Sequence, residues 1–176
     1  MKLKSLAAVA VVSAMAAGNA NANLLFDIYA GATAGFGGAT WFADEHESYT
    51  AQSYGAVLGI DIPFVRGELE YNYLTSDDAK VHVVMANVYA KMPMPLVKPY
   101  LGAGIGMTVG GDYGDLDAEN GMAYQGMLGV TFDLPIVPFN IDVEGRALYA
   151  NHVFKLPGDY ANLVQYDARV KLRYVF

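Results

Sequence analysis

The feature that most constrains the fold is a strict alternation of apolar residues with polar or small ones. In the last segment, 165–176, apolar side chains occupy every second position. The positions between them carry charges, among them Asp167, Arg169, Lys171 and Arg173. Because successive side chains of a β-strand point to opposite faces, this pattern predicts a strand with one apolar and one charged face. We expect the final side chain, Phe176, to belong to the apolar face of that strand.

The same alternation recurs along most of the chain. It predicts seven further strands, at 26–36, 53–64, 66–74, 81–92, 99–110, 122–134 and 140–149. Segments of about ten residues suit tilted strands that cross a membrane. Eight strands can close into a barrel that leaves no unpaired edge. The predicted fold is therefore all-β, an eight-stranded antiparallel up-and-down transmembrane β-barrel.

The connections between these segments alternate in character. Three are short and marked by proline, around Pro63, between Pro93 and Pro99, and between Pro135 and Pro138. The other four are polar or acidic, and three of them are long: 37–52, 75–80, 110–121 and 151–162. Such an alternation is typical of a barrel with one rim in the periplasm and the other outside the cell.

Fourteen charged residues lie in the predicted strands, nearly all on one face. The acidic ones are Asp27, Asp61, Glu68, Glu70, Asp133, Asp142, Glu144 and Asp167, and the basic ones are Arg66, Lys91, Arg146, Arg169, Lys171 and Arg173. Unpaired charge in a narrow interior is very costly, so the near balance of signs favours a charged network inside the lumen. The alternative is a secreted ligand carrier, a soluble barrel with its apolar face inward.

The N-terminal segment has the order of a secretory signal. Lys2 and Lys4 precede an apolar run of 12 residues, and Ala20 and Ala22 supply a cleavage pattern. A helix of this length rises about 18 Å, too little to span roughly 30 Å of hydrocarbon. We therefore expect residues 1–22 to be a cleaved signal peptide and residues 23–176 to form one barrel domain. The expected location is the outer membrane of a Gram-negative bacterium.

Net charge excludes one class of function. The chain has 11 Lys and Arg against 18 Asp and Glu. Loss of residues 1–22 removes two lysines, which leaves a net charge of −9. Nucleic-acid binding needs clustered basic residues, so we expect no nucleic-acid partner.

Three segments carry a resemblance to a known family. They are "KPYLGAGIGM" (98–107), "NIDVEGRALY" (140–149) and the terminal "LRYVF" (172–176). Together with the signal and the eight alternating strands, they resemble small outer-membrane barrels of the OmpA, OmpX and opacity-protein type over residues 23–176. The resemblance implies an assembly signal read by the barrel-assembly machinery, formed by Tyr166, Leu172, Tyr174 and Phe176. The family includes adhesins, complement-evasion proteins and structural anchors.

Two predicted loops carry side chains that can take part in chemistry. His46 and Ser48 share the first outer connection, where a hydroxyl beside a base could act on lipid A, but an exposed polar loop is the favoured interpretation. The third connection carries Asp112, Asp115, Asp117 and Glu119, which do not match the EF-hand pattern. A solvated acidic loop is favoured there, with weak divalent-cation bridging to lipopolysaccharide phosphates as the alternative. We predict no catalytic residue, metal site or cofactor.

These observations predict a structural or surface-interaction protein that is not an enzyme. The barrel would be a monomeric anchor with a plugged lumen, and its four outer loops would meet an unidentified surface ligand. Outer-membrane lipid and lipopolysaccharide are the other expected partners. The alternatives are a small channel and, third, a lipid A-modifying enzyme.

Overall fold

A computed structural model describes most of the chain. The described residues are 26–42, 46–76, 79–113, 116–117, 121–134, 136–156 and 159–176. The predicted signal peptide, residues 1–22, lies outside them. Within the described residues, no helix is long and apolar enough to cross a membrane.

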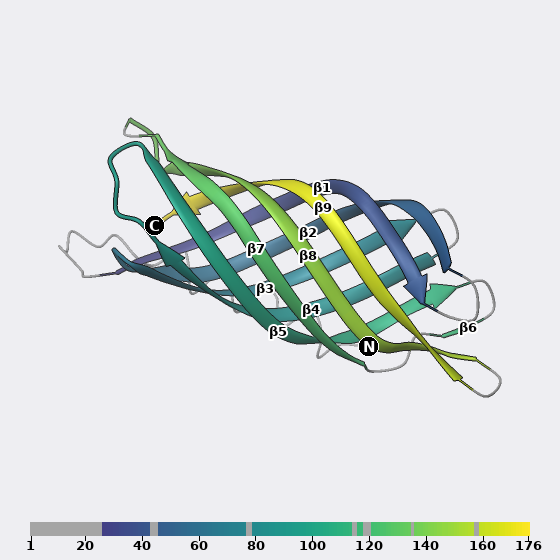
Figure 1. Ribbon diagram of the computed structural model, residues 1–176. Helices are drawn as coiled ribbons and strands as arrows, with labels where there is room; N and C mark the ends of the chain where they lie inside the picture. Colours follow the sequence, from purple (N-terminus) through teal and green to yellow (C-terminus); the bar gives the residue numbers. More distant parts are fainter. Residues whose placement is uncertain are drawn as a thin grey trace.

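The described residues form one antiparallel sheet that closes on itself (Figure 1). Its strands are β1 (Asp27–Phe42), β2 (His46–Asp61), β3 (Val65–Ser76), β4 (Ala79–Lys91), β5 (Val97–Tyr113), β6 (Leu116–Asp117), β7 (Met122–Asp133), β8 (Phe139–Leu156) and β9 (Asp159–Val175). The order around the barrel is β4-β3-β2-β1-β9-β8-β7-β5, and the pairing of β4 with β5 closes it. The two-residue β6 pairs only with the end of β5. The predicted eight-stranded antiparallel barrel is confirmed.

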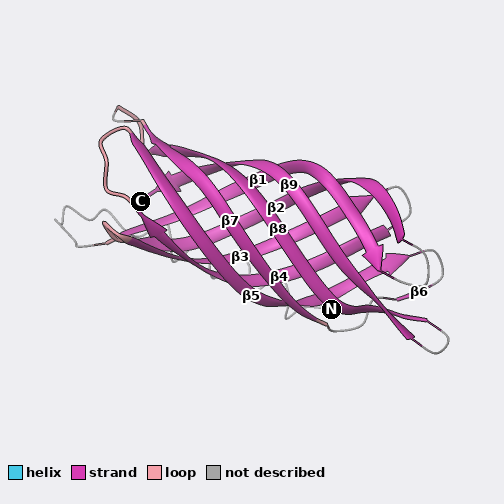
Figure 2. Ribbon diagram, viewed as in Figure 1, coloured by secondary structure: helices cyan, strands magenta, loops and turns pink. Residues whose placement is uncertain are grey.

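Two of the three short turns and the C-terminus lie at one end of the barrel (Figure 2). Residues 62–64 join β2 to β3, and residues 92–96 join β4 to β5. The backbone N–H of Phe176 donates to the carbonyl of Ile28 on β1 at 3.0 Å, so the chain closes the barrel up to its last residue. We call this end the turn end and the opposite one the hairpin end.

The strands are longer at the hairpin end than predicted. The pairing of β1 with β2 continues to Phe42 and His46, and that of β8 with β9 to Leu156 and Asp159. The prediction of long connections at 37–52 and 151–162 was therefore wrong in extent. Backbone ladder bonds do not depend on side-chain polarity, so strands can continue after the alternation between apolar and polar faces has faded.

One irregularity interrupts β5 near the hairpin end. Thr108 pairs with Val83 and Gly110 with His82, so Val109 is an extra residue, a β-bulge. Gly110 has a φ of 158° and Gly111 a φ of 154°, values that L side chains rarely adopt. These two glycines allow β5 to pass the bulge without steric strain.

Candidate functional site

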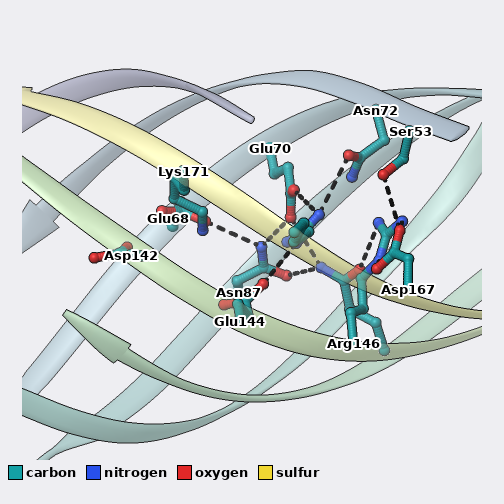
Figure 3. A network of polar contacts seen from close by, with 12 residues as sticks. Ser53, Glu68, Glu70, Asn72, Asn87, Asp142, Glu144, Arg146, Asp167 and Lys171 are labelled. Atoms are coloured by element: carbon teal, nitrogen blue, oxygen red, sulfur yellow. Dashed lines mark hydrogen bonds and ion pairs between the residues drawn. The ribbon is translucent and has the colours of Figure 1, made fainter. Parts of the chain in front are cut away.

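The interior of the barrel is lined by charged and polar side chains from all eight long strands. Over the first ten residues of β3 and of β7, exposed or half-exposed side chains alternate with buried ones. Figure 3 shows the buried polar side chains from facing strands converging within the lumen. We describe them from the turn end towards the hairpin end.

Asp142 on β8 is the centre of the group nearest the turn end. Arg173 donates from Nε to Oδ2 of Asp142 at 2.9 Å and from Nη2 to Oδ1 at 3.0 Å. Arg66 on β3 donates from Nη1 to the same Oδ2 at 2.9 Å. Asp61 receives Nη1 of Arg173 at 3.2 Å and forms a second ion pair with Lys91. The carboxylate of Asp142 thus binds the guanidinium groups of Arg173 and Arg66. The guanidinium group of Arg173 also reaches a second carboxylate, that of Asp61.

The next group surrounds Glu68 on β3. Nζ of Lys171 lies 2.6 Å from its Oε1. The hydroxyls of Tyr89 and Tyr29 donate to Glu68 at 2.8 Å and 2.7 Å. The ring of Tyr89 also lies 4.0 Å from the guanidinium carbon of Arg66, a cation–π contact. The buried charges of Glu68 and Arg66 are therefore compensated by tyrosine hydroxyls and a tyrosine ring as well as by opposite charges.

Arg169 on β9 joins two further carboxylates. Its Nε donates to Oε1 of Glu144 on β8 at 2.6 Å, and its Nη1 lies 2.6 Å from Oε1 of Glu70 on β3. Glu70 also accepts from Asn87 at 2.7 Å and Gln125 at 3.0 Å. These contacts link opposite walls of the barrel.

The last ion pair towards the hairpin end joins Arg146 on β8 to Asp167 on β9. Nε of Arg146 donates to Oδ1 of Asp167 at 3.0 Å, and its Nη2 contacts Oδ2. The hydroxyl of Ser53 donates to Asp167 at 2.8 Å and Gln165 donates to it at 3.2 Å. Asp167 is thereby saturated with donors.

The structure brings thirteen of the fourteen predicted charged residues into ion pairs. The exception is Asp27, which lies exposed at the turn end and shows no ion pair within the described part of the chain. Sequence reasoning missed Lys98, which forms an ion pair with Asp133. With Lys98 counted and Asp27 set aside, the paired set contains seven acids and seven bases.

An apolar layer fills the interior at the hairpin end, and the sequence analysis missed it. All its members are buried, and they come from seven of the strands: Ala39, Ala51, Leu74, Val81, Val83, Met85, Ala123, Leu148, Ala150, Val153 and Leu163. Ala39, Ala51 and Val153 lie in segments that the sequence predicts to be loops. The sequence signal that could have predicted this layer is the occurrence of Val81, Val83 and Met85 at alternate positions of one strand, on the face that points inward.

The turn end is hollowed instead of filled. An open cavity of about 730 Å³ lies there. Its lining includes Asp27, Asp61, Lys91, Lys98 and Asp133, with prolines and apolar residues of the turns around them. The paired charges at the end of the network thus face solvent at this mouth.

The outer surface has the opposite polarity. Leu128 on β7 is 66% exposed and Leu101 on β5 is 63% exposed, whereas Arg173 inside the barrel is 0% exposed. Six tyrosines are also exposed on the outer surface: Tyr54, Tyr71, Tyr124, Tyr149, Tyr166 and Tyr174. In water this inversion would be unfavourable, because apolar area stays exposed while charges lose solvent.

The predicted assembly-signal residues share the outer face of β9. Tyr166, Leu172, Tyr174 and Phe176 are all exposed. The ring of Tyr174 makes edge contacts with Phe139 at 5.2 Å and with Phe176 at 5.0 Å between centroids. Phe139, Tyr174 and Phe176 thus form an aromatic patch at the turn end.

The candidate loop chemistry falls outside what the structure describes. His46 and Ser48 lie in β2, but their side chains are not among those described. Asp115 and Glu119 lie outside the described residues, and the side chain of Asp117 does too. Within the residues that are described, no three His, Asp or Glu side chains are grouped to hold a metal ion.

Comparison with solved structures identifies the same architecture elsewhere. The Neisserial surface protein A is 20% identical, with a TM-score of 0.65 over 82% of this chain and 96% of that one. The N-terminal β-barrel domain of Pseudomonas aeruginosa OprF is 14% identical, with a TM-score of 0.54 over 83% of this chain and 97% of that one. No protein-family model matches the chain, and no curated protein matches it. The chain therefore has the fold of small outer-membrane β-barrels.

Proposed function

We propose that this protein is a monomeric outer-membrane barrel that does not conduct, and that it serves as an anchor for a surface-interaction face at its hairpin end. The observation that carries the proposal is the inverted polarity of the barrel. Exposed leucines on the outside suit lipid, while seven acids and seven bases inside are paired with one another.

The turn end would face the periplasm. Short turns and the C-terminus lie there, and the longer hairpins of β1–β2 and β8–β9 extend at the other end. Bacterial outer-membrane barrels place short turns in the periplasm and longer loops outside. A peptide tag inserted between residues 157 and 158 would then be accessible to antibody on intact cells. A tag between Pro93 and Met94 would become accessible only after the outer membrane is opened.

Two features support a closed lumen. An eight-stranded barrel has an interior just wide enough for its side chains, and here large side chains such as Arg66, Arg169 and Tyr89 are fully buried within it. Beyond the ion pairs, the side chains of the apolar layer around Val83 and Leu148 carry no charge that could compensate a passing ion. Ions entering from the turn-end cavity would have to break the network and then cross this layer.

Planar-bilayer recording on the refolded mature chain tests the closed lumen. We expect no stepwise conductance, with a large porin as the positive control. Stepwise conductance whose ion selectivity changes in Glu70→Gln or Arg146→Gln would establish the channel alternative instead. The enzyme alternative has its own test, because it requires a changed lipid A mass on expression that is lost in His46→Ala.

A further inference from the structure

A histidine on the outer surface lies among aromatic side chains that contact its ring. His82 on β4 is opposite Tyr73 of β3, with ring centroids 5.1 Å apart. Its Nδ1 lies 2.6 Å from the hydroxyl of Tyr71, whose ring stacks on the imidazole at 6.0 Å. All three side chains are on the outer face, because Val81 and Val83 on either side of His82 point into the lumen. The imidazole is thus held in one orientation.

The other edge of this imidazole faces open space. On the β5 side, His82 is paired with Gly110 at the bulge. A Cβ built on Gly110 would meet only Cδ2 of His82, at 3.9 Å. Nε2 adjoins Cδ2 in the ring, and the structure shows no hydrogen-bond partner for it within the described part of the chain. The bulge and its glycine therefore leave a notch beside a ring nitrogen that can bind a ligand.

Charge and polarity at this notch suit an anion. Lys80 is exposed two residues further towards the hairpin end, on the same outer face of β4. Thr75 of β3 and Asp112 of β5 are its neighbours in register. The ammonium of Lys80 and an N–H of His82 are the donors that a phosphate oxygen accepts. Asp112 is the one acidic neighbour in register with Lys80, and it opposes anion binding.

An apolar hollow lies next to this polar group, towards the middle of the barrel. It has a volume of about 380 Å³. Its lining includes Ala30, Ala56, Leu58, Leu69, Tyr71 and Val84. Tyr71 is shared between the hollow and the His82 group. A molecule with a phosphate at one end and a hydrocarbon chain at the other would match both parts.

We propose that His82 and Lys80 bind the phosphate monoester of an anionic lipid headgroup, with the lipid's acyl chain in the adjoining hollow. The proposal rests on the proposed function, which places this end of the barrel in the outer leaflet. The hollow selects the lipid over free phosphate, because free phosphate would leave its apolar lining unoccupied.

The test is a titration of the refolded mature chain in zwitterionic micelles with dioctanoyl phosphatidic acid. Ring ¹⁵N signals of the three histidines are followed, and His82→Gln identifies the signal of His82. We expect that signal to move saturably with phosphatidic acid. Inorganic phosphate and dioctanoyl phosphatidylcholine at equal concentration should leave it unmoved.

Variants separate the parts of the site. Lys80→Gln should weaken binding about fivefold, the effect expected of one basic residue at an anionic surface. Asp112→Asn should strengthen it. Ala56→Phe fills the hollow and should weaken binding, whereas Ala103→Phe, an exposed position on β5 outside the hollow, should not change it.

Two results would overturn this inference. One is an equal response to phosphatidylcholine or inorganic phosphate. The other is unchanged affinity in both Lys80→Gln and Ala56→Phe. Each variant is also run unboiled on an SDS gel. A folded-barrel band without phosphatidic acid binding refutes this site alone, whereas loss of that band in the parent chain refutes the proposed function.

Discussion

Nη1 of Arg169 on β9 lies 2.6 Å from Oε1 of Glu70 on β3, although β1 and β2 separate these strands in the barrel wall. The pair therefore crosses the lumen and does not follow the wall. Glu144 on the adjacent β8 holds the same guanidinium at 2.6 Å. A single basic side chain thus ties together three strands, and its removal leaves two buried carboxylates without their cation.

Arg169→Met is expected to destabilise the barrel. Breaking a buried ion pair by removing one partner costs about 3–5 kcal/mol, because the remaining charge stays buried and uncompensated. The measurement is urea unfolding of the refolded barrel in lipid vesicles. Lys98→Met is the control, since its ion pair with Asp133 lies half-exposed at the turn end and should contribute less than about 1 kcal/mol. Equal stabilities of the two variants would contradict the account of the lumen.

Gly129→Ala is expected to disturb the packing of the lumen. A Cβ at this position would lie 2.6 Å from Cζ and Oη of Tyr100, whose hydroxyl donates to Glu144 at 2.9 Å. Displacing that ring should cost about 1–3 kcal/mol, the usual range for overpacking. The same strand offers a matched control in Gly126→Ala, because a Cβ there meets nothing within 4 Å. Vesicle unfolding of both variants checks the difference, and a Gly129→Ala barrel as stable as its control would refute it.

Leu128→Arg tests whether the outer surface lies in lipid. This residue is near the middle of β7 on the exposed face, so an arginine there should cost about 2–4 kcal/mol, the value for a charge at the bilayer midplane. Met122→Arg, on the same face at the hairpin end of β7, should cost only about 0–1 kcal/mol. If both arginines were tolerated equally, water and not hydrocarbon would surround the barrel.

Phe176→Ala tests the predicted assembly signal separately from stability. The backbone hydrogen bond from residue 176 to Ile28 does not need the side chain, so refolding of the purified variant into vesicles should proceed nearly as in the parent chain. In cells, the amount of folded barrel should fall severalfold if the terminal ring is read during assembly. The comparison is made on unboiled gels of membrane fractions. A variant that assembles normally in cells would remove Phe176 from the signal.

The alternation in the sequence was enough to predict the barrel and the face that carries the charges. Arg169, Lys171 and Arg173 all point inward as their spacing indicated. The partners of each charge were not predictable, because pairs such as Arg169 with Glu70 depend on barrel closure and on the stagger of distant strands. Lys98 was missed because it lies between Pro95 and Pro99, in a segment interpreted as a turn.

The apolar layer at the hairpin end escaped prediction for another physical reason. Ala39, Ala51 and Val153 lie in stretches rich in polar residues, where both barrel faces mix polar and apolar side chains and period two fades. Tyr89 was likewise not recognised as a lumen residue. Its hydroxyl donates a hydrogen bond to Glu68 on the adjacent strand. Whether the two groups meet depends on the lengths of both side chains as well as on their positions in the strands.

Heat-modifiability of the outer-membrane fraction tests the central claim most directly. Detergent-extracted membranes are run on an SDS gel with and without boiling. A closed barrel in the outer membrane predicts a faster-migrating unboiled band that shifts to the unfolded position on heating, and none of it in the periplasmic fraction. A single heat-insensitive band in the soluble periplasm would contradict the account and would point to a secreted barrel with its faces assigned the wrong way round.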